Sequence, residues 1–333
     1  MNPYHLARPL LFRLDPEKAH DLTLAALARC PTLMPKMQGG QPVELLGLTF
    51  PNRLGLAAGL DKNGVAISAF DRAGLGFIEI GTVTPRPQPG NDRPRLYRLP
   101  EHQAIINRMG FNNDGIDALI ARVAATPRPR AILGINLGKN KNTPNEQALS
   151  DYLTGIQKAW AHADYLAINI SSPNTAGLRD LQHGAALRTL LTGIKSEQQR
   201  LAASTQKHVP IVVKIAPDLD DDALNDLLDT IAVCGIDGII ATNTTLDKSA
   251  VAAHPHGGEQ GGLSGAPLTA KSTAILTKIR ARLPEIPLIA AGGVMNAADM
   301  QAKLDAGADL VQIYTGLIYH GPQLIRDCLR QLG

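Results

Sequence analysis

A lysine interrupts an apolar stretch of the chain, in IVVKIAPD at 211–218. We expect this stretch to be a buried strand, and a buried ammonium group needs an anionic partner or a lowered pKa. Lys214 could form a Schiff base with a carbonyl substrate, stabilise negative charge that develops on a reduced cofactor, or take part in a structural ion pair. Lys62, in the loop AAGLDKNG, has the same options.

Four carboxamides follow predicted strands or lie in the connections between them: Asn107, Asn169, Asn174 and Asn243. Each offers a hydrogen-bond donor and an acceptor together. A planar ligand with alternating C=O and N–H groups, such as a pyrimidine, would match such a set. One asparagine in a turn indicates only a turn, but four around one opening favour a binding site.

The segment YLAINISSPNTAG at 165–177 begins as an apolar strand and then turns abruptly polar. Ser172 in this segment could be a nucleophile or a base. A nucleophilic serine needs an adjacent general base, and although His162 and His183 flank the segment, no triad is evident. The residue types alone therefore also allow Ser172 to be a loop cap.

Glycines follow the last two predicted strands, at Gly292, Gly293 and in YTG at 314–316. Glycine lets a ligand approach the main chain closely, and free backbone N–H groups there favour an anion. Two ordinary tight turns are the alternative. In a barrel, the loops after the seventh and eighth strands commonly bind phosphate, which favours a phosphate site here.

Short apolar runs alternate with helical patterns from residue 54 onward. Near-continuous apolar strands are typical of a parallel sheet that is buried on both faces. The eight runs are 54–58, 77–80, 131–136, 165–170, 211–215, 237–242, 287–291 and 309–314. The helical patterns are 64–73, 114–124, 146–162, 184–205, 220–234, 267–283, 296–306 and 322–331.

This alternation predicts an α/β fold, a (β/α)8 TIM barrel with an N-terminal two-helix appendage. An open doubly wound sheet is the alternative, but no GxGxxG follows the first strand. The polar residues described above follow the carboxyl ends of the strands, where the active sites of such barrels lie. We therefore expect them to meet in one site.

The first 40 residues differ from the rest and are expected to form a separate segment, 1–40, beside a barrel of 41–333. Asp15 and Pro16 predict the start of a helix, whereas Pro9 is expected to interrupt one. Two short amphipathic helices with basic residues could lie on an anionic membrane surface. A helical hairpin packed on the barrel floor is the alternative.

Composition excludes several classes of protein. With 333 residues, 44% of them hydrophobic, the chain can bury a large core. The net charge is only +3 and like charges do not occur in runs, so the sequence lacks the basic patches typical of nucleic-acid-binding proteins. Cys30, Cys234 and Cys328 are too far apart for a zinc site, an iron–sulfur cluster or a disulfide framework, which suggests a reducing compartment. No signal peptide and no apolar run of membrane-spanning length is found.

Ten segments of the chain, taken in order, form a recognisable set of motifs. They are LAAGLDKNG, IEIGTVTPRPQPGNDRPRLYRL, INRMGFNN, GINLGKNKNTP, AINISSPNTAGLRDLQ, VVKIAPD, IATNTT, GGLSGAPL, AAGGV and LVQIYTGLIYHGP. This set resembles the motifs of the dihydroorotate dehydrogenases, flavin-dependent (β/α)8 barrels of pyrimidine synthesis. The closer likeness is to the quinone-dependent, membrane-associated class 2, and it covers essentially the whole chain. In the soluble class a cysteine stands at the position of Ser172.

The resemblance implies oxidation of (S)-dihydroorotate to orotate in de novo pyrimidine (UMP) biosynthesis, with FMN as hydride acceptor and no metal. Ser172 would be the base that removes the C5 proton, while hydride leaves C6 for N5 of FMN. The implied cofactor residues are Ala58, Gly59, Lys62, Thr82, Asn136, Asn169, Lys214, Thr242, Gly265, Gly293, Tyr314 and Thr315. The implied substrate residues are Lys62, Asn107, Arg108, Met109, Gly110, Phe111, Asn169, Asn174, Asn243 and Thr244.

The resemblance also implies that 1–40 forms the mouth of an apolar tunnel through which a quinone, ubiquinone or menaquinone, reaches the flavin. We then expect a monomer bound peripherally to the cytoplasmic side of the inner membrane. Three alternatives stay open: a soluble fumarate- or NAD-linked dihydroorotate dehydrogenase, a non-flavin barrel lyase that uses Lys214, and a binding protein without activity. Ser172 and the 1–40 segment argue against the first.

Overall fold

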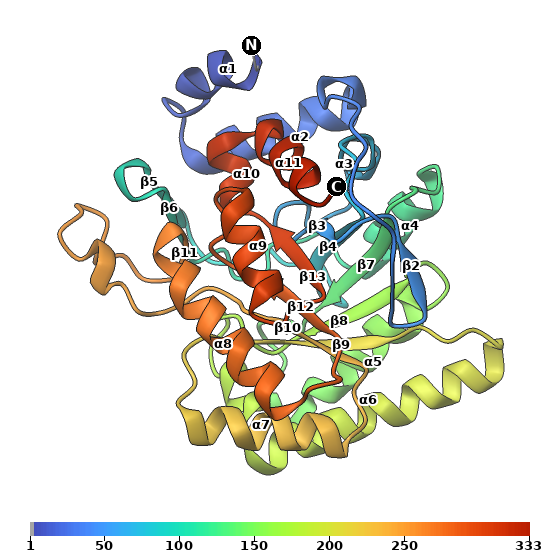
Figure 1. Cartoon of the computed structure of the whole chain (residues 1–333). Coiled ribbons are helices and arrows are strands. Elements are labelled where there is room, and N and C mark those ends of the chain that lie inside the picture. Colours follow the sequence, from blue (N-terminus) through green and yellow to red (C-terminus); the bar gives the residue numbers. More distant parts are fainter. Residues whose placement is uncertain (1–2) are drawn as a thin grey trace.

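Eight parallel strands close into a barrel in the computed structural model of the chain, which describes residues 3–333 (Figure 1). Around the barrel, each strand pairs with the next, and β13 pairs with β3 to close the ring. All eight predicted strands and the (β/α)8 barrel are confirmed. The strands are β3 (Leu54–Leu56), β4 (Phe77–Val83), β7 (Ile132–Leu137), β8 (Tyr165–Asn169), β9 (Ile211–Ile215), β10 (Gly238–Ala241), β12 (Leu288–Ala291) and β13 (Leu310–Ile313).

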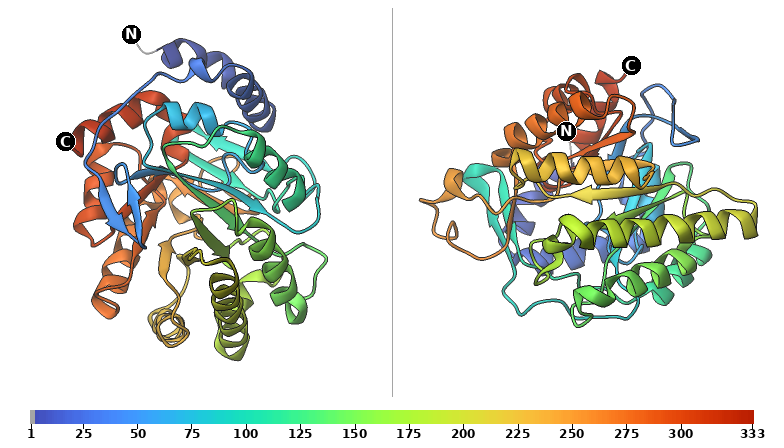
Figure 2. Two further views of the ribbon diagram at one scale, coloured as in Figure 1. Left: turned by 90° about the vertical axis from the view of Figure 1, so that its right-hand side faces the viewer. Right: turned by 90° about the horizontal axis from the view of Figure 1, so that it is seen from below.

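Helices surround the strands, as the left view of Figure 2 shows. The eight predicted helical segments are confirmed, with ends that differ by up to a few residues. They are α3 (Ile67–Arg72), α4 (Ile116–Ala125), α5 (Ala148–Ala159), α6 (Gly184–Thr205), α7 (Asp221–Val233), α8 (Thr269–Arg282), α9 (Ala297–Asp305) and α11 (Pro322–Gln331). The short α10 (Thr315–His320) follows β13 and was not predicted.

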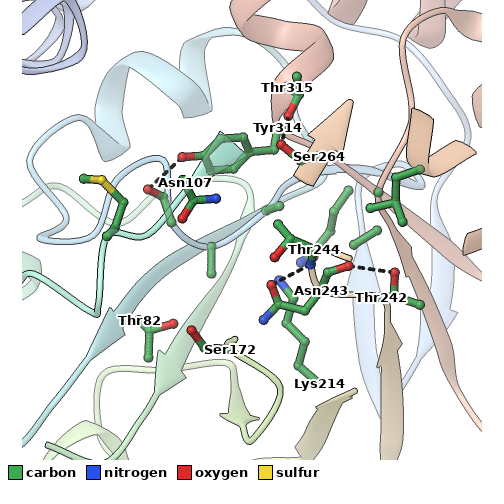
Figure 3. Close-up of a pocket in the computed structure, with 18 of the residues that line it drawn as sticks. Thr82, Asn107, Ser172, Lys214, Thr242, Asn243, Thr244, Ser264, Tyr314 and Thr315 are labelled. Atoms are coloured by element: carbon green, nitrogen blue, oxygen red, sulfur yellow. Dashed lines mark hydrogen bonds between the residues drawn. The ribbon is translucent and has the colours of Figure 1, made fainter. Parts of the chain in front are cut away.

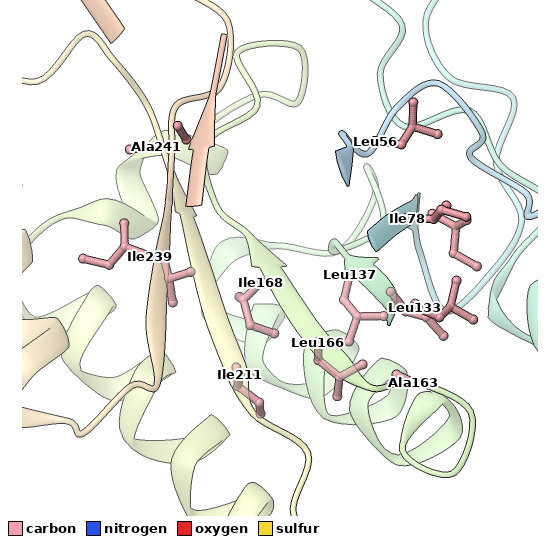
Figure 4. Packing of buried hydrophobic residues seen from close by; sticks show 14 of the residues in the cluster. Leu56, Ile78, Leu133, Leu137, Ala163, Leu166, Ile168, Ile211, Ile239 and Ala241 are labelled. Atoms are coloured by element: carbon pink, nitrogen blue, oxygen red, sulfur yellow. The ribbon is translucent and has the colours of Figure 1, made fainter. Parts of the chain in front are cut away.

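The main core lies between the barrel and its helices. In β8, Leu166 and Ile168 point outward into this core (Figure 4). Tyr165 and Ala167 of the same strand belong to a second cluster inside the barrel. This alternation is the two-residue period of a strand, and both faces are apolar because both are buried. Each fully buried leucine or isoleucine contributes about 1.5–3 kcal/mol to stability.

A hairpin of β1 (Val43–Leu45) and β2 (Leu48–Phe50) closes the amino-terminal end of the barrel. Phe50 is fully buried there and meets Phe77 edge-on, with ring centroids 5.6 Å apart. The hairpin therefore forms the floor. The N-terminal helices lie instead at the opposite end, where Arg8 donates to the Tyr319 carbonyl at 2.9 Å, so the alternative that placed the first 40 residues on the floor is wrong.

A three-stranded antiparallel sheet lies at the other end, in the order β11-β6-β5. It was not predicted, because its strands lie in two connections far apart in sequence. They are β5 (Leu96–Leu99), β6 (Ala104–Asn107) and β11 (Gly262–Gly265). The sheet brings Asn107 and Gly265 to the mouth of the barrel.

The N-terminal segment consists of α1 (Pro3–Leu11), α2 (Pro16–Arg29) and a 3-10 turn (Pro31–Leu33). Asp15 caps α2 as predicted, since its carboxylate accepts from the N–H groups of Glu17 and Lys18 at 3.1 and 3.0 Å. Pro9 lies inside α1, so the predicted interruption is wrong. Proline removes one hydrogen bond near the end of a short helix, and the chain continues helical for two residues more.

The remaining 3-10 turns connect these elements. They are Pro100–His102, Asn145–Gln147, Leu178–Gln182, Ser249–Val251 and Ala266–Leu268. Among residues 3–333, no helix is long and apolar enough to cross a bilayer.

Candidate active site

A pocket opens at the carboxyl ends of the barrel strands, and we call it the barrel pocket (Figure 3). It collects most of the residues singled out from the sequence, because the ends of parallel strands all face the same side. Those in its wall are Ala58, Gly59, Lys62, Thr82, Asn107, Met109, Gly110, Phe111, Asn169, Ser172, Asn174, Lys214, Thr242, Asn243, Thr244, Gly265, Gly293, Tyr314 and Thr315.

Two residues of the expected set do not line the barrel pocket. Asn136 is fully buried behind Thr82, whose hydroxyl donates to its Oδ1 at 2.5 Å. Arg108 pairs instead with Glu259 at 2.8 Å and donates to the Tyr97 hydroxyl. Asn136 therefore acts on the pocket through Thr82, and Arg108 braces the loop that carries Met109 and Phe111.

Sequence reasoning missed two polar residues of the wall, Ser264 and Gln312. Gln312 stands in the apolar run DLVQIY, the same signal that singled out Lys214. Ser264 gave no such signal, because it lies in β11, a strand that was not predicted. Its hydroxyl is 2.8 Å from that of Thr315.

The four carboxamides meet at the pocket. The Asn174 amide donates to Asn107 Oδ1 at 3.1 Å, so β6 and the loop after β8 are joined across the opening. Asn243 donates to the Ser171 hydroxyl at 3.0 Å, and Asn169 Oδ1 accepts from Ser171. Side chains with both donors and acceptors thus gather in the wall, as a planar heterocycle requires.

Ser172 lies on the loop after β8 and is 5% exposed. Its hydroxyl oxygen accepts from the Asn174 backbone N–H at 3.2 Å, so it caps this turn while its side chain borders the pocket. Among the described residues, neither His162 nor His183 lines the pocket. The arrangement provides a hydroxyl in the pocket wall and, among the described residues of that wall, no histidine to make it a nucleophile.

Both lysines give the pocket positive charge. Lys214, in β9, is 6% exposed, and burial lowers its pKa while the Glu79 carboxylate opposes that effect. Burial lowers the pKa of Lys62 to about 8, and Arg95 adds to this, whereas Glu17 acts in the opposite direction. The two ammonium groups favour an anionic or electron-rich ligand.

One end of the pocket is formed by bare main chain. Gly293 has φ +74°, and a Cβ there would lie 2.4 Å from the Cα of Thr269. A Cβ at Gly316 would lie 2.2 Å from the carbonyl oxygen of Val294. Only glycine fits these positions, so the predicted glycine-lined end is present and side chains cannot fill it.

A second cavity, the apolar pocket, lies between the N-terminal helices and the barrel and encloses about 540 Å³. Its wall combines residues of α1 and α2 with residues next to the barrel mouth. These include Ala7, Leu11, Phe12, Ala19, His20, Leu24, Leu27, Leu60, Phe70, Arg98, Leu317 and Ile318. Tyr314 borders both cavities.

Polar contacts fix α2 over the apolar pocket. Glu17 is buried and pairs with Arg95 at 2.7 Å and with Arg93 at 2.9 Å. Burial lowers the pKa of His20, in the wall of the cavity, to about 3, and neighbouring Lys62 adds to this. His20 is therefore neutral, and Arg98 and Arg326 are the basic residues of an otherwise largely apolar lining.

Comparisons with known proteins show the family of the chain. A model of the family described as "Dihydroorotate dehydrogenase" matches residues 42–333. A protein of Dichelobacter nodosus named "Dihydroorotate dehydrogenase (quinone)" is 66% identical over 99% of this chain and 98% of its own length. One of Akkermansia muciniphila with the same name is 52% identical over 99% of this chain and 96% of its own.

Among solved structures, that of DHODH from Eimeria tenella in complex with ferulenol has a TM-score of 0.89 and 38% identity. It covers 97% of this chain and 93% of its own. The chain belongs to the dihydroorotate dehydrogenase family and, by these relatives, to its quinone-dependent class.

Proposed function

We propose that the chain oxidises (S)-dihydroorotate to orotate with FMN as the cofactor and passes the electrons to a membrane quinone, in de novo pyrimidine biosynthesis. The observation that supports this proposal most strongly is a shared wall, since Tyr314 borders both the polar barrel pocket and the apolar pocket. A site for a charged pyrimidine and a site for an apolar acceptor thus lie on two sides of one residue.

The barrel pocket fits FMN, and a flavin is the cofactor that the family implies. The glycine-lined end beside Gly293, with the Ser264 and Thr315 hydroxyls close by, suits a phosphate. Lys214, Thr82 and Asn169 suit the polar edge of a flavin ring. When bound, FMN supplies the acceptor for the hydride from C6 of the substrate.

The substrate would lie between this cofactor position and the carboxamides. Asn107, Asn174 and Asn243 would hydrogen-bond the pyrimidine ring, and Lys62 would attract its carboxylate. Thr244 would add a hydroxyl contact. The Phe111 ring, 8% exposed, would exclude water from the reacting carbons.

Ser172 would take the proton from C5. A serine hydroxyl is a weak base, so it acts only where the negative charge that develops on the substrate is stabilised. Lys62 and the amide donors would provide that stabilisation. The hydroxyl oxygen already accepts one N–H, from Asn174, which holds it in place beside the pocket.

Residues 1–40 would form the quinone entrance and the membrane contact, with 41–333 as the FMN-binding barrel. Leu6, Leu10, Leu22 and Leu33 are exposed large apolar side chains of this segment. Exposed Arg13, Lys18, Arg29 and Lys36 add positive charge. Such a surface suits peripheral binding to an anionic leaflet, on the cytoplasmic side of the inner membrane, by a monomer.

A steady-state assay tests the function. Orotate formation would be measured with a soluble ubiquinone analogue, a menaquinone analogue, fumarate or NAD+ as the only acceptor. We expect turnover with a quinone and none with fumarate or NAD+. Turnover with fumarate or NAD+ alone would instead assign the chain to a soluble type, and absence of orotate with every acceptor would overturn the proposal.

A further inference from the structure

A carboxylate is buried inside the barrel, below the barrel pocket. Glu79, on β4, is 0% exposed and accepts three hydrogen bonds. They come from Asn136 Nδ2 at 2.8 Å, the Tyr165 hydroxyl at 2.7 Å and Gln312 Nε2 at 2.7 Å. The four residues lie on four different strands, so the carboxylate joins β4, β7, β8 and β13 across the barrel interior.

The sequence makes room for this network. Gly134 lies between Glu79 and Tyr165 in the register of β4, β7 and β8. A Cβ at Gly134 would lie 2.2 Å from the Tyr165 ring, so only glycine lets the phenol pass over β7 to reach the carboxylate. Burial raises the pKa of Tyr165, and the nearby Glu79 carboxylate raises it further. The Tyr165 hydroxyl therefore keeps its proton and acts as a donor.

Because both oxygens of the Glu79 carboxyl group accept hydrogen bonds, they determine how the two amides face. Asn136 must turn its NH2 group to Glu79, so its oxygen faces Thr82 and accepts that hydroxyl proton at 2.5 Å. The Thr82 oxygen in turn accepts from Asn169 Nδ2 at 2.9 Å. Glu79 thereby fixes the direction of a hydrogen-bond chain that ends in the pocket wall.

Gln312 is turned in the same way, and it also lines the barrel pocket. Its Nε2 donates to Glu79, which leaves Oε1 free. Gln312 is 1% exposed and lines the barrel pocket, and within residues 3–333 its Oε1 has no hydrogen-bond partner. A buried acceptor without a partner costs about 1–3 kcal/mol, so this oxygen is placed to accept an N–H from a ligand.

Glu79 also adds charge to the site. It opposes the effect of burial on Lys214, whose side chain borders the barrel pocket (Figure 3). A negative charge below the pocket reduces the net positive potential that Lys214 provides there. Electrons added to a ligand in the pocket are therefore stabilised less than they would be if Lys214 stood there without Glu79.

We propose that Glu79 is a positioning residue of the cofactor site: it turns Gln312 so that its Oε1 accepts an N–H of the flavin ring, orients the Asn136–Thr82–Asn169 chain, and lowers the flavin reduction potential. This inference rests on the proposed FMN site. Neither Glu79 nor Gln312 was among the residues expected to bind the cofactor.

The test compares Glu79→Gln with Tyr165→Phe in the purified FMN-loaded protein. Glu79→Gln removes the charge and turns an NH2 group toward the three donors that Glu79 accepts from, so at least one hydrogen bond is lost. Tyr165→Phe removes one hydrogen bond and keeps the charge. We expect Glu79→Gln to favour reduced over oxidised FMN at least tenfold more than the wild type does, a rise of about 30 mV in the two-electron midpoint potential. Tyr165→Phe should keep the wild-type potential although both variants lower the melting temperature.

Equal potentials in the wild type and Glu79→Gln would overturn the inference and leave the proposed function intact. A wild-type protein that binds no flavin would overturn the function itself. If Glu79→Gln does not fold, the FMN affinity of Gln312→Leu tests the inference instead, measured by titration of the apoprotein with FMN. About tenfold weaker binding is expected from the lost acceptor, and unchanged affinity would contradict the Gln312 contact.

Discussion

The Tyr314 hydroxyl donates a hydrogen bond to the Gly59 carbonyl at 3.3 Å; Gly59 lines the barrel pocket, and Tyr314 borders both this pocket and the apolar pocket. Gly59 has φ +101°, and a Cβ on it would lie 3.2 Å from the Tyr314 ring. The contact therefore depends on glycine at 59. It ties the loop after β3 to the residue that follows β13.

Gly59→Ala should weaken FMN binding as well as stability. The positive φ costs about 1–3 kcal/mol with a side chain present, and the methyl group also presses on Tyr314. Gly47→Ala is the matched control, because Gly47 has φ +72° and nothing within 4 Å of the added Cβ. Melting temperature and FMN titration measure the two effects. Equal FMN affinities in both variants would show that the Gly59–Tyr314 contact does not shape the cofactor site.

Ser172→Ala should slow reduction of the bound flavin by dihydroorotate about 100-fold or more, because the base is lost. Orotate should still bind, since the carboxamides remain. Ser172→Cys should restore part of the rate, because a thiol can also accept the proton. Stopped-flow absorbance of the flavin measures the step, and an Ala variant that reduces its flavin at nearly the wild-type rate would refute the role of Ser172.

Ala19→Trp should raise the KM for quinone about tenfold or more without slowing flavin reduction by dihydroorotate. Ala19 is buried in the wall of the apolar pocket, so the indole would occupy the acceptor's space. Ala25→Trp, on the exposed side of the same helix, controls for any effect on α2 itself. Equal loss in both half-reactions would mean that α2 supports the barrel and does not form an acceptor site.

The KM for dihydroorotate should rise as the pH increases above about 8. Burial lowers the pKa of Lys62 to about 8, so the free enzyme loses this positive charge above that pH and attracts the substrate carboxylate less. Lys62→Arg should remove the rise, because arginine stays charged. The profile is measured between pH 6.5 and 9.5, with flavin absorbance as a check on folding. A flat wild-type profile would mean that Lys62 does not bind the substrate through its charge.

Most of the barrel was predictable, because its strands are apolar on both faces and each is followed by a helix with a recognisable period. The β5–β6–β11 sheet was not: β5 and β6 lie in one long connection, and β11 pairs with β6 from more than 150 residues away, as Gly262 does with Asn107. No local pattern records such pairing. The β1–β2 hairpin was not predicted for another reason: its strands of three residues are too short to show a hydrophobic period.

The site was predictable to the extent that its residues follow strand ends. Lys214, Asn169 and Asn243 lie at or just after such ends and all reach the barrel pocket. Asn136 also lies near the end of a strand, yet it faces Thr82 inside the barrel. Which polar residue touches a ligand and which supports it from behind depends on side-chain depth, and sequence position does not contain that information.

The most direct test of the account separates the two half-reactions under anaerobic conditions. The purified protein is mixed first with dihydroorotate and then, in parallel samples, with a soluble quinone or with fumarate, while flavin absorbance is followed. The account predicts a yellow protein that bleaches with dihydroorotate and is reoxidised rapidly by quinone alone. A protein that carries no flavin after incubation with FMN, or one that is not bleached by dihydroorotate, would contradict it.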